Sequence, residues 1–128
     1  MLNRQVEPFF ITRKVSDRRI VHVLHVLNVE PWLGPKHLAA TVELSPSHLR
    51  HLFKQQMGTS ITAFARELRL QLAGQLLRTT FRSLKQIRYD VGIPDASNFV
   101  RDFKRRFGMT PSVYRQSANS RFDQQIAV

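Results

Sequence analysis

At 128 residues the chain has room for one ordinary domain or two very small ones, which excludes a large multidomain enzyme. Twenty Lys and Arg against nine Asp and Glu leave a formal net charge of +11, and such a positive field collects polyanions, with nucleic acid as the leading partner. The absence of cysteine excludes disulfides, thiol nucleophiles and Cys-based zinc sites and fits the reducing cytoplasm, and no uninterrupted apolar stretch predicts a membrane span.

The first part of the chain predicts three helices after a loose leader, residues 1–15. Asp17 is the expected N-cap of the first helix, whose apolar residues keep helical spacing until Pro31 ends it. A short helix over residues 37–42 follows. Ser45 as N-cap, with Pro46 at the first helical position, then gives a strong start signal for the third helix.

A long helix is predicted from Ser60, a good N-cap, to about Thr79. Its apolar residues form two stripes rather than one, so we expect packing from two sides. We therefore predict that residues 59–80 form a linker helix. It joins a first subdomain, residues 16–58, to a second subdomain, residues 81–116. The two stripes are Ile61, Phe64, Ala65, Leu68, Leu72 and Leu76 on one side and Leu70, Ala73 and Leu77 on the other.

Three further helical segments are predicted after the linker. Ser83 and Gln86 form a capping box for the first of them, which Gly92 ends. A helix introduced by Asp95 or Pro94 runs to Phe107, and Thr110 starts one short turn of helix. Residues 117–128 are expected to be a polar tail. The fold class is therefore all-α, with about seven helices and no strands.

The chain also repeats itself. At a constant offset of 49 residues Leu38 pairs with Ile87 and Val42 with Val91, and after one inserted residue Phe53 pairs with Phe103, and Gly58 with Gly108. Each copy is a short helix, a tight turn and a longer helix closed by glycine, which is the helix-turn-helix pattern. Two copies are too few for a solenoid, so on a chain of this charge they favour DNA binding.

The longer helix of each copy carries a polar and basic face opposite its apolar one. Donors near the helix start suit base edges, and cations further along suit phosphates. We interpret Arg50 and Arg101 as base-reading residues. The outward residues are Ser47, Arg50, His51 and Lys54 in the first copy and Ser97, Arg101 and Lys104, flanked by Asn98 and Arg105, in the second. Lys54, Asn98, Lys104 and Arg105 are the expected phosphate contacts.

Two motifs carry a family resemblance: Ser45–Lys54 (SPSHLRHLFK) and the run from Phe99 through Phe107-Gly108-Met109-Thr110-Pro111 to Tyr114-Arg115. With the glycines and apolar residues around them, they resemble the DNA-binding domain of AraC/XylS-type transcription regulators over residues 35–115. The resemblance implies two recognition helices that enter successive major-groove segments of double-stranded DNA. It implies base contacts at Ser47, Arg50 and His51 and at Ala96, Ser97 and Arg101.

The chain departs from the family pattern at Arg88, where the family usually has a small alanine, as the first copy does at Ala39. A long side chain there must extend to solvent or push the two helices apart. Ala96 offers no hydrogen bond, so its position is expected to contact a thymine methyl or nothing.

Other functions are weaker expectations. His22 with His25, and His48 with His51, each share a helical face, but neither pair has an obvious third ligand, so no metal or other cofactor is expected. No phosphate loop, nucleophile elbow or spaced carboxylate pair predicts an enzyme. The alternative function is a basic RNA-binding or anionic-surface-binding helical protein.

Oligomeric state depends on the residues ahead of the resemblance. About 35 residues are too few for a sensing domain. We therefore expect either a stand-alone regulator that binds an asymmetric site as a monomer, or a fragment of a longer dimeric regulator. RNA polymerase is a further expected partner, and a membrane is not.

Overall fold

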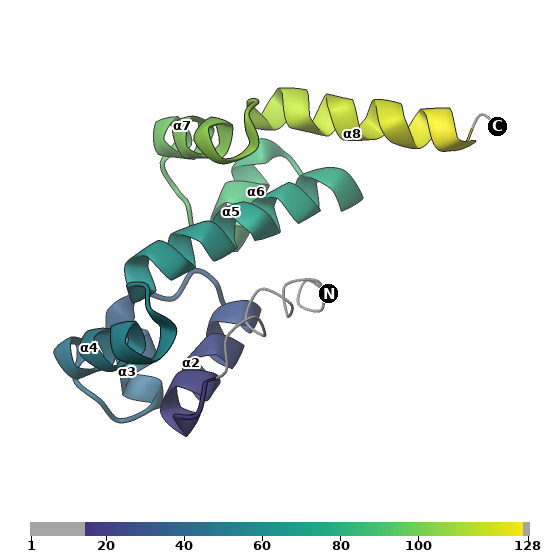
Figure 1. The fold of residues 1–128 in the computed structure, drawn as a ribbon. Coiled ribbons are helices and arrows are strands. Elements are labelled where there is room, and N and C mark those ends of the chain that lie inside the picture. The colour runs from purple at the N-terminus through teal and green to yellow at the C-terminus, as the bar shows by residue number, and fades with distance from the viewer. Residues whose placement is uncertain (1–14, 127–128) are drawn as a thin grey trace. The chain divides into compact units, whose positions relative to one another are not determined.

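Residues 15–126 form seven helices and no strand in a computed structural model of the chain, in which side chains are described as far as residue 119 (Figure 1). The all-α prediction is confirmed. All but the last residue of the predicted leader, 1–15, lies outside the described residues. The helices are α2 (Arg18–Val29), α3 (Pro35–Thr41), α4 (Pro46–Met57), α5 (Ile61–Thr79), α6 (Leu84–Val91), α7 (Ala96–Phe107) and α8 (Pro111–Ile126).

The predicted helix starts are confirmed by their capping bonds. Asp17 accepts a hydrogen bond from the backbone N–H of Arg19 at 2.9 Å, and Ser45 from that of His48 at 3.1 Å. Ser60 and Asp95 accept in the same way from the N–H groups of Ala63 and Asn98. These side chains satisfy N–H groups that the first turn of a helix leaves without a partner.

The capping box predicted at the start of α6 is wrong in one half. Ser83 does accept from the backbone N–H of Gln86 at 3.0 Å, but the Gln86 side chain donates forward to Asp90 at 2.8 Å instead of accepting from the backbone N–H of Ser83. Asp90 is also paired with Arg82. The negative charge of Asp90 strengthens the hydrogen bond from the Gln86 amide N–H and so favours the forward orientation of this side chain.

The last helix is longer than predicted. One short turn was expected after Thr110, followed by a polar tail over residues 117–128, but α8 continues from Pro111 to Ile126. The residues after Pro111 include no glycine or further proline to stop a helix. The backbone can therefore continue helically although no apolar stripe marks it.

The chain divides into two compact units, residues 1–69 and 70–128, with the boundary inside α5. All nine apolar residues of the two predicted stripes of α5 are buried, as packing from two sides requires. The first unit comprises α2, α3, α4 and the start of α5, where the rings of Phe53 and Phe64 meet edge to face at 5.5 Å. The second comprises the rest of α5 with α6, α7 and α8.

Arg69 holds the segment that follows α2 in the first unit. Its Nε donates to the carbonyl of Pro31 at 2.6 Å and its Nη2 to that of Leu33 at 3.1 Å. Burial lowers the pKa of Arg69 from its ordinary value, and the nearby positive charge of Arg66 lowers it further. A guanidinium nevertheless stays protonated in proteins, so both bonds are charge-assisted.

An aromatic cluster centres on Phe103 in the second unit. The Phe103 ring lies 5.7 Å from that of Phe99, 4.4 Å from that of Phe107 and 5.3 Å from that of Tyr114. Gly74 of α5 allows this packing, because a Cβ there would lie 3.2 Å from Cζ of Phe107. The cluster therefore fixes the buried face of α7, and with it the direction of the exposed face.

The two helix-turn-helix turns have matching backbone bonds but different residues at the tight position. The N–H of Leu44 donates to the carbonyl of Ala39 at 3.0 Å, and that of Ile93 to the carbonyl of Arg88 at 2.8 Å. Gly92 takes a φ of 90° in the second turn, whereas Glu43 takes a φ of 58° in the first. The first turn thus places a residue with a Cβ in the left-handed region, where L-residues are strained.

Glu43→Gly should stabilise the protein by about 0.5 to 1 kcal/mol. Glycine removes a steric cost of roughly 1 to 2 kcal/mol but loses more backbone entropy on folding. The Glu43 side chain is exposed, so little packing is lost. Urea unfolding followed by circular dichroism checks this, with Gly92→Glu as the reciprocal variant that should destabilise. A midpoint that does not rise for Glu43→Gly would contradict strain at this turn.

Arg88 extends outward rather than forcing α6 and α7 apart. Ile87 beside it is fully buried, while the half-buried Arg88 turns its guanidinium to the carbonyl of Pro94 and lies 5.7 Å from the centre of the Tyr89 ring. The carbonyl belongs to the segment just before α7. Arg88, which departs from the family pattern, therefore donates a hydrogen bond to the segment between α6 and α7 and does not separate the two helices.

None of the helices in the described part of the chain combines the length and the apolar character needed to cross a bilayer.

Candidate nucleic-acid interface

The outer face of α4 gathers the residues predicted for the first copy. Leu49, Leu52 and Phe53 are buried on the inner face. The four predicted contact residues, Ser47, Arg50, His51 and Lys54, are all exposed. Spacings of three and four residues place them on one side of the helix. The helix contains no Asp or Glu, so no negative charge of its own opposes an approaching phosphate.

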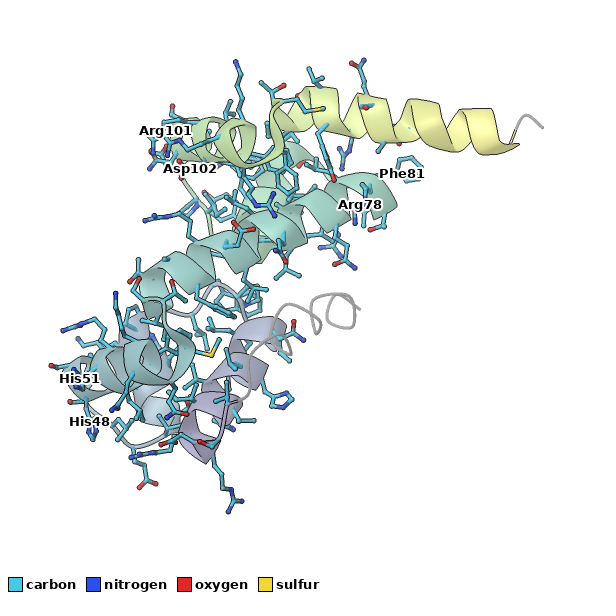
Figure 2. All side chains as sticks on the ribbon, viewed as in Figure 1. His48, His51, Arg78, Phe81, Arg101 and Asp102 are labelled. Carbon is cyan, nitrogen blue, oxygen red and sulfur yellow. The ribbon has the colours of Figure 1, made fainter. Side chains whose placement is uncertain are left out.

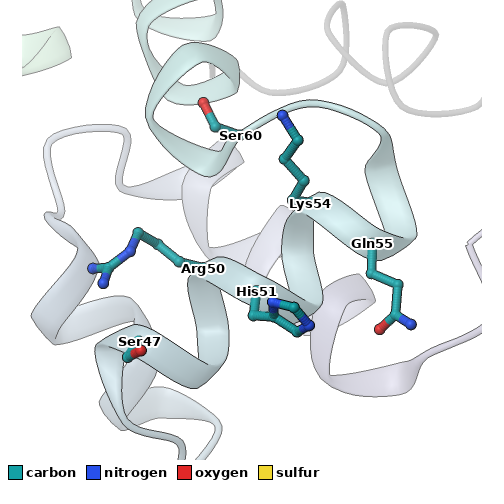
Figure 3. Close-up of a pocket in the computed structure, with 6 residues that line it drawn as sticks. All are labelled: Ser47, Arg50, His51, Lys54, Gln55 and Ser60. Atoms are coloured by element: carbon teal, nitrogen blue, oxygen red, sulfur yellow. The ribbon is translucent and has the colours of Figure 1, made fainter.

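A cavity of about 630 Å³ lies on this face of α4 (Figure 3). It is lined by all four predicted residues and by Gln55 and Ser60. The sequence identified Ser60 only as a helix cap and did not single out Gln55, although Gln55 lies one helical turn after His51. The first copy therefore presents hydroxyl, imidazole, guanidinium, ammonium and amide groups around one hollow, which suits the mixed donors and acceptors of DNA.

The outer face of α7 carries the residues predicted for the second copy. Phe99 and Phe103 are buried on the inner face. All six predicted residues are exposed: Ala96, Ser97, Asn98, Arg101, Lys104 and Arg105. The last turn of the helix is strongly basic, with Lys104, Arg105 and Arg106 in succession.

Asp102 is a partly buried residue of α7 that pairs with this face and that the sequence did not single out. Its Oδ1 lies 3.2 Å from Nε of Arg101 and 3.7 Å from Nη1 of Arg105. It is the only acidic residue within α7. Its pairing with Arg101 and Arg105 was not predicted, because these contacts depend on side-chain rotamers rather than on spacing.

The histidine pairs stay in the positions that spacing predicted. His22 and His25 are both exposed on α2, and Figure 2 shows His48 and His51 close together on α4, where both are exposed. Among the described residues, no group of three or more His, Asp or Glu side chains is arranged to hold a metal ion.

Comparison with known proteins gives the family. Residues 38–117 match the family described as a helix-turn-helix domain. The arabinose operon regulatory protein of Escherichia coli (strain K12) is 40% identical over 78 residues, which are 61% of this chain and 27% of that protein. The chain spans 14% to 40% of the length of the curated regulators that it matches.

Solved structures of transcription regulators are also similar to this chain. A transcriptional regulator from Chromobacterium violaceum, described as having an AraC-type DNA-binding domain, is 30% identical with a TM-score of 0.67. The match covers 79% of this chain and 92% of that one. The DNA-binding domain of AdpA, a global transcriptional factor solved in complex with a target DNA, superposes with a TM-score of 0.73 over 85% of this chain and 99% of that chain. At 22% identity this second likeness shows the fold alone.

The matched family covers both helix-turn-helix copies, and with the likeness to the AraC-type structure it bears out the resemblance found in the sequence. The chain therefore belongs to the AraC-type family of helix-turn-helix DNA-binding domains.

Proposed function

We propose that this chain is a sequence-specific, double-stranded DNA-binding transcription regulator whose helices α4 and α7 each enter a major groove. One observation carries the proposal: every predicted contact residue is exposed on one of these two helices, while the opposite face of each helix is buried. A buried apolar face fixes the helix, and the exposed polar face is free to meet base edges.

The proposed contacts divide into two classes. Ser47, Arg50 and His51 on α4, and Ala96, Ser97 and Arg101 on α7, meet base edges. Arg50 and Arg101 suit guanine, because a guanidinium donates two parallel hydrogen bonds to O6 and N7. Ala96 suits a thymine methyl. Lys54, Asn98, Lys104 and Arg105 bind phosphates and set the register of the protein on the duplex.

We infer that one chain binds an asymmetric site. In the repeat register Arg50 corresponds to Val100, and His51 to Arg101, so the two helices present different groups to DNA. A chain with two different recognition helices does not require a palindromic DNA site. Within a longer regulator, a dimer would bind two such sites. The relatives are regulators of transcription, so we propose binding rather than catalysis as the activity, action in the cytoplasm, and RNA polymerase as a further partner.

The salt dependence of DNA affinity tests the phosphate contacts. The logarithm of the affinity should fall with the logarithm of salt concentration with a slope of several units, about 0.9 for each phosphate neutralised. Lys54→Ala and Lys104→Ala should each reduce the slope by about one and weaken binding to all duplexes alike. Fluorescence anisotropy with labelled duplexes measures both quantities.

Arg18→Ala is the matched control for these lysine variants, because Arg18 is exposed on α2, outside both helix-turn-helix pairs. It should leave the slope unchanged. A nearly flat salt response would contradict the proposed function. Tighter binding of an unstructured RNA or an anionic vesicle than of any duplex would favour the alternative function, for which the net charge of +11 is the supporting observation.

A further inference from the structure

Asp102 stands where the first copy has an apolar core residue. At the repeat offset of 50 its counterpart is Leu52, which is buried on the inner face of α4. The Asp102 side chain is itself only 20% exposed. A carboxylate in such a position loses hydration and needs charged hydrogen-bond partners in return. It accepts a hydrogen bond from Arg101 and forms an ion pair with Arg105, two proposed DNA-contacting residues whose side chains are 58% and 75% exposed.

The geometry of the Arg101 bond leaves the reading end of that side chain free. Asp102 accepts from Nε, the guanidinium nitrogen nearest the helix. The two terminal nitrogens can still donate side by side to O6 and N7 of guanine. A guanidinium held through Nε therefore keeps both terminal nitrogens available for a base, and it loses less rotamer freedom when it binds one.

We propose that Asp102 is a positioning residue that sets the base specificity of α7: it holds the Arg101 guanidinium through Nε so that the terminal nitrogens face a guanine. The proposal rests on the proposed function, in which α7 enters the major groove. Asp102 does not touch the base itself.

The same carboxylate weakens non-specific binding to DNA. Its negative charge lies 3.7 Å from Nη1 of Arg105, a proposed phosphate contact, so it weakens the attraction to the phosphates of every duplex. Specificity is the difference between the binding free energies for the right and the wrong sequences. Asp102 favours the right sequence by orienting Arg101 and weakens binding to all other sequences by its charge. Removing the charge should therefore raise affinity for random DNA and lower discrimination at the base that Arg101 reads.

The test uses the full 128-residue chain and duplexes selected from a randomised library by the unchanged protein. The base pair read by Arg101 is located as the one whose preference Arg101→Ala loses. Asp102→Asn, which keeps the shape but removes the charge, should reduce the preference at that base pair about three- to tenfold and raise affinity for random duplexes about twofold or more. In the Arg101→Ala background, Asp102→Asn should not change the preference further.

Asp90→Asn is the matched control, because Asp90 also pairs with an arginine, Arg82, but lies on α6. It should alter affinity for all duplexes without changing any base preference. Asp102→Leu is the second variant, and it should fold because the first copy has leucine at the equivalent position. Both Asp102 variants should give the same loss of preference.

An unchanged base preference in both Asp102 variants, with the preference lost in Arg101→Ala, would overturn the role of Asp102 and leave the proposed function standing. A preference that survives Arg101→Ala would overturn it as well, because Arg101 would not be the reader. Failure of the unchanged protein to select any sequence would instead overturn the proposed function, and the role of Asp102 with it.

Discussion

Phe103→Ala should destabilise the protein by about 3 to 5 kcal/mol, the usual cost of deleting a fully buried aromatic ring. Phe103 is fully buried and contacts the rings of Phe99, Phe107 and Tyr114. The cost has two parts, since the apolar surface of the ring is lost and its three neighbours are left around a cavity. Urea unfolding followed by circular dichroism measures it.

Phe81→Ala is the matched control for this experiment. Phe81 lies between α5 and α6 and is fully exposed, so the same chemical change removes no buried surface (Figure 2). Its effect should stay within about 0.5 kcal/mol. Similar losses for the two variants would show that the cluster around Phe103 is not the core of the second unit.

Arg50→Ala and Arg101→Ala should each cost about 1 to 3 kcal/mol on the selected duplex, which is roughly a 5- to 150-fold loss of affinity. Each variant loses a bidentate contact that discriminates one base. Affinity for random duplexes should change much less, because no base is read there. Titrations of both duplexes at the same salt concentration measure the difference.

Arg18→Ala serves as the arginine control here too, and it should affect the two duplexes equally and weakly. Equal losses on selected and random DNA for Arg50→Ala or Arg101→Ala would assign that arginine to the phosphate contacts instead.

Much of the fold was predictable because local signals and apolar spacing agree. Ser45 with Pro46 starts α4 and Gly58 ends it, and the structure places the cap, the proline and the left-handed glycine as the sequence predicts. The repeat then carries the same interpretation from α4 to α7, including which face is buried. Helix propensity, capping residues and apolar spacing indicate the same structure at each of these helices, so the fold can be predicted from the sequence.

The parts that were missed depend on side-chain geometry or on the absence of a signal. The extension of α8 has no apolar stripe, so no periodicity marks it. The cavity on α4 includes Ser60 because the chain turns back at Gly58, which spacing along one helix does not show. The bonds of Arg69, Arg88 and Asp102 depend on which carbonyl or guanidinium a rotamer reaches.

Selection of duplexes from a randomised library by the unchanged protein, Arg50→Ala and Arg101→Ala tests most directly whether α4 and α7 read separate sequences. We predict a non-palindromic preference with two distinct blocks, of which Arg50→Ala relaxes one and Arg101→Ala the other. A single palindromic preference, or relaxation of the same base pairs by both variants, would contradict two independent readers in one chain.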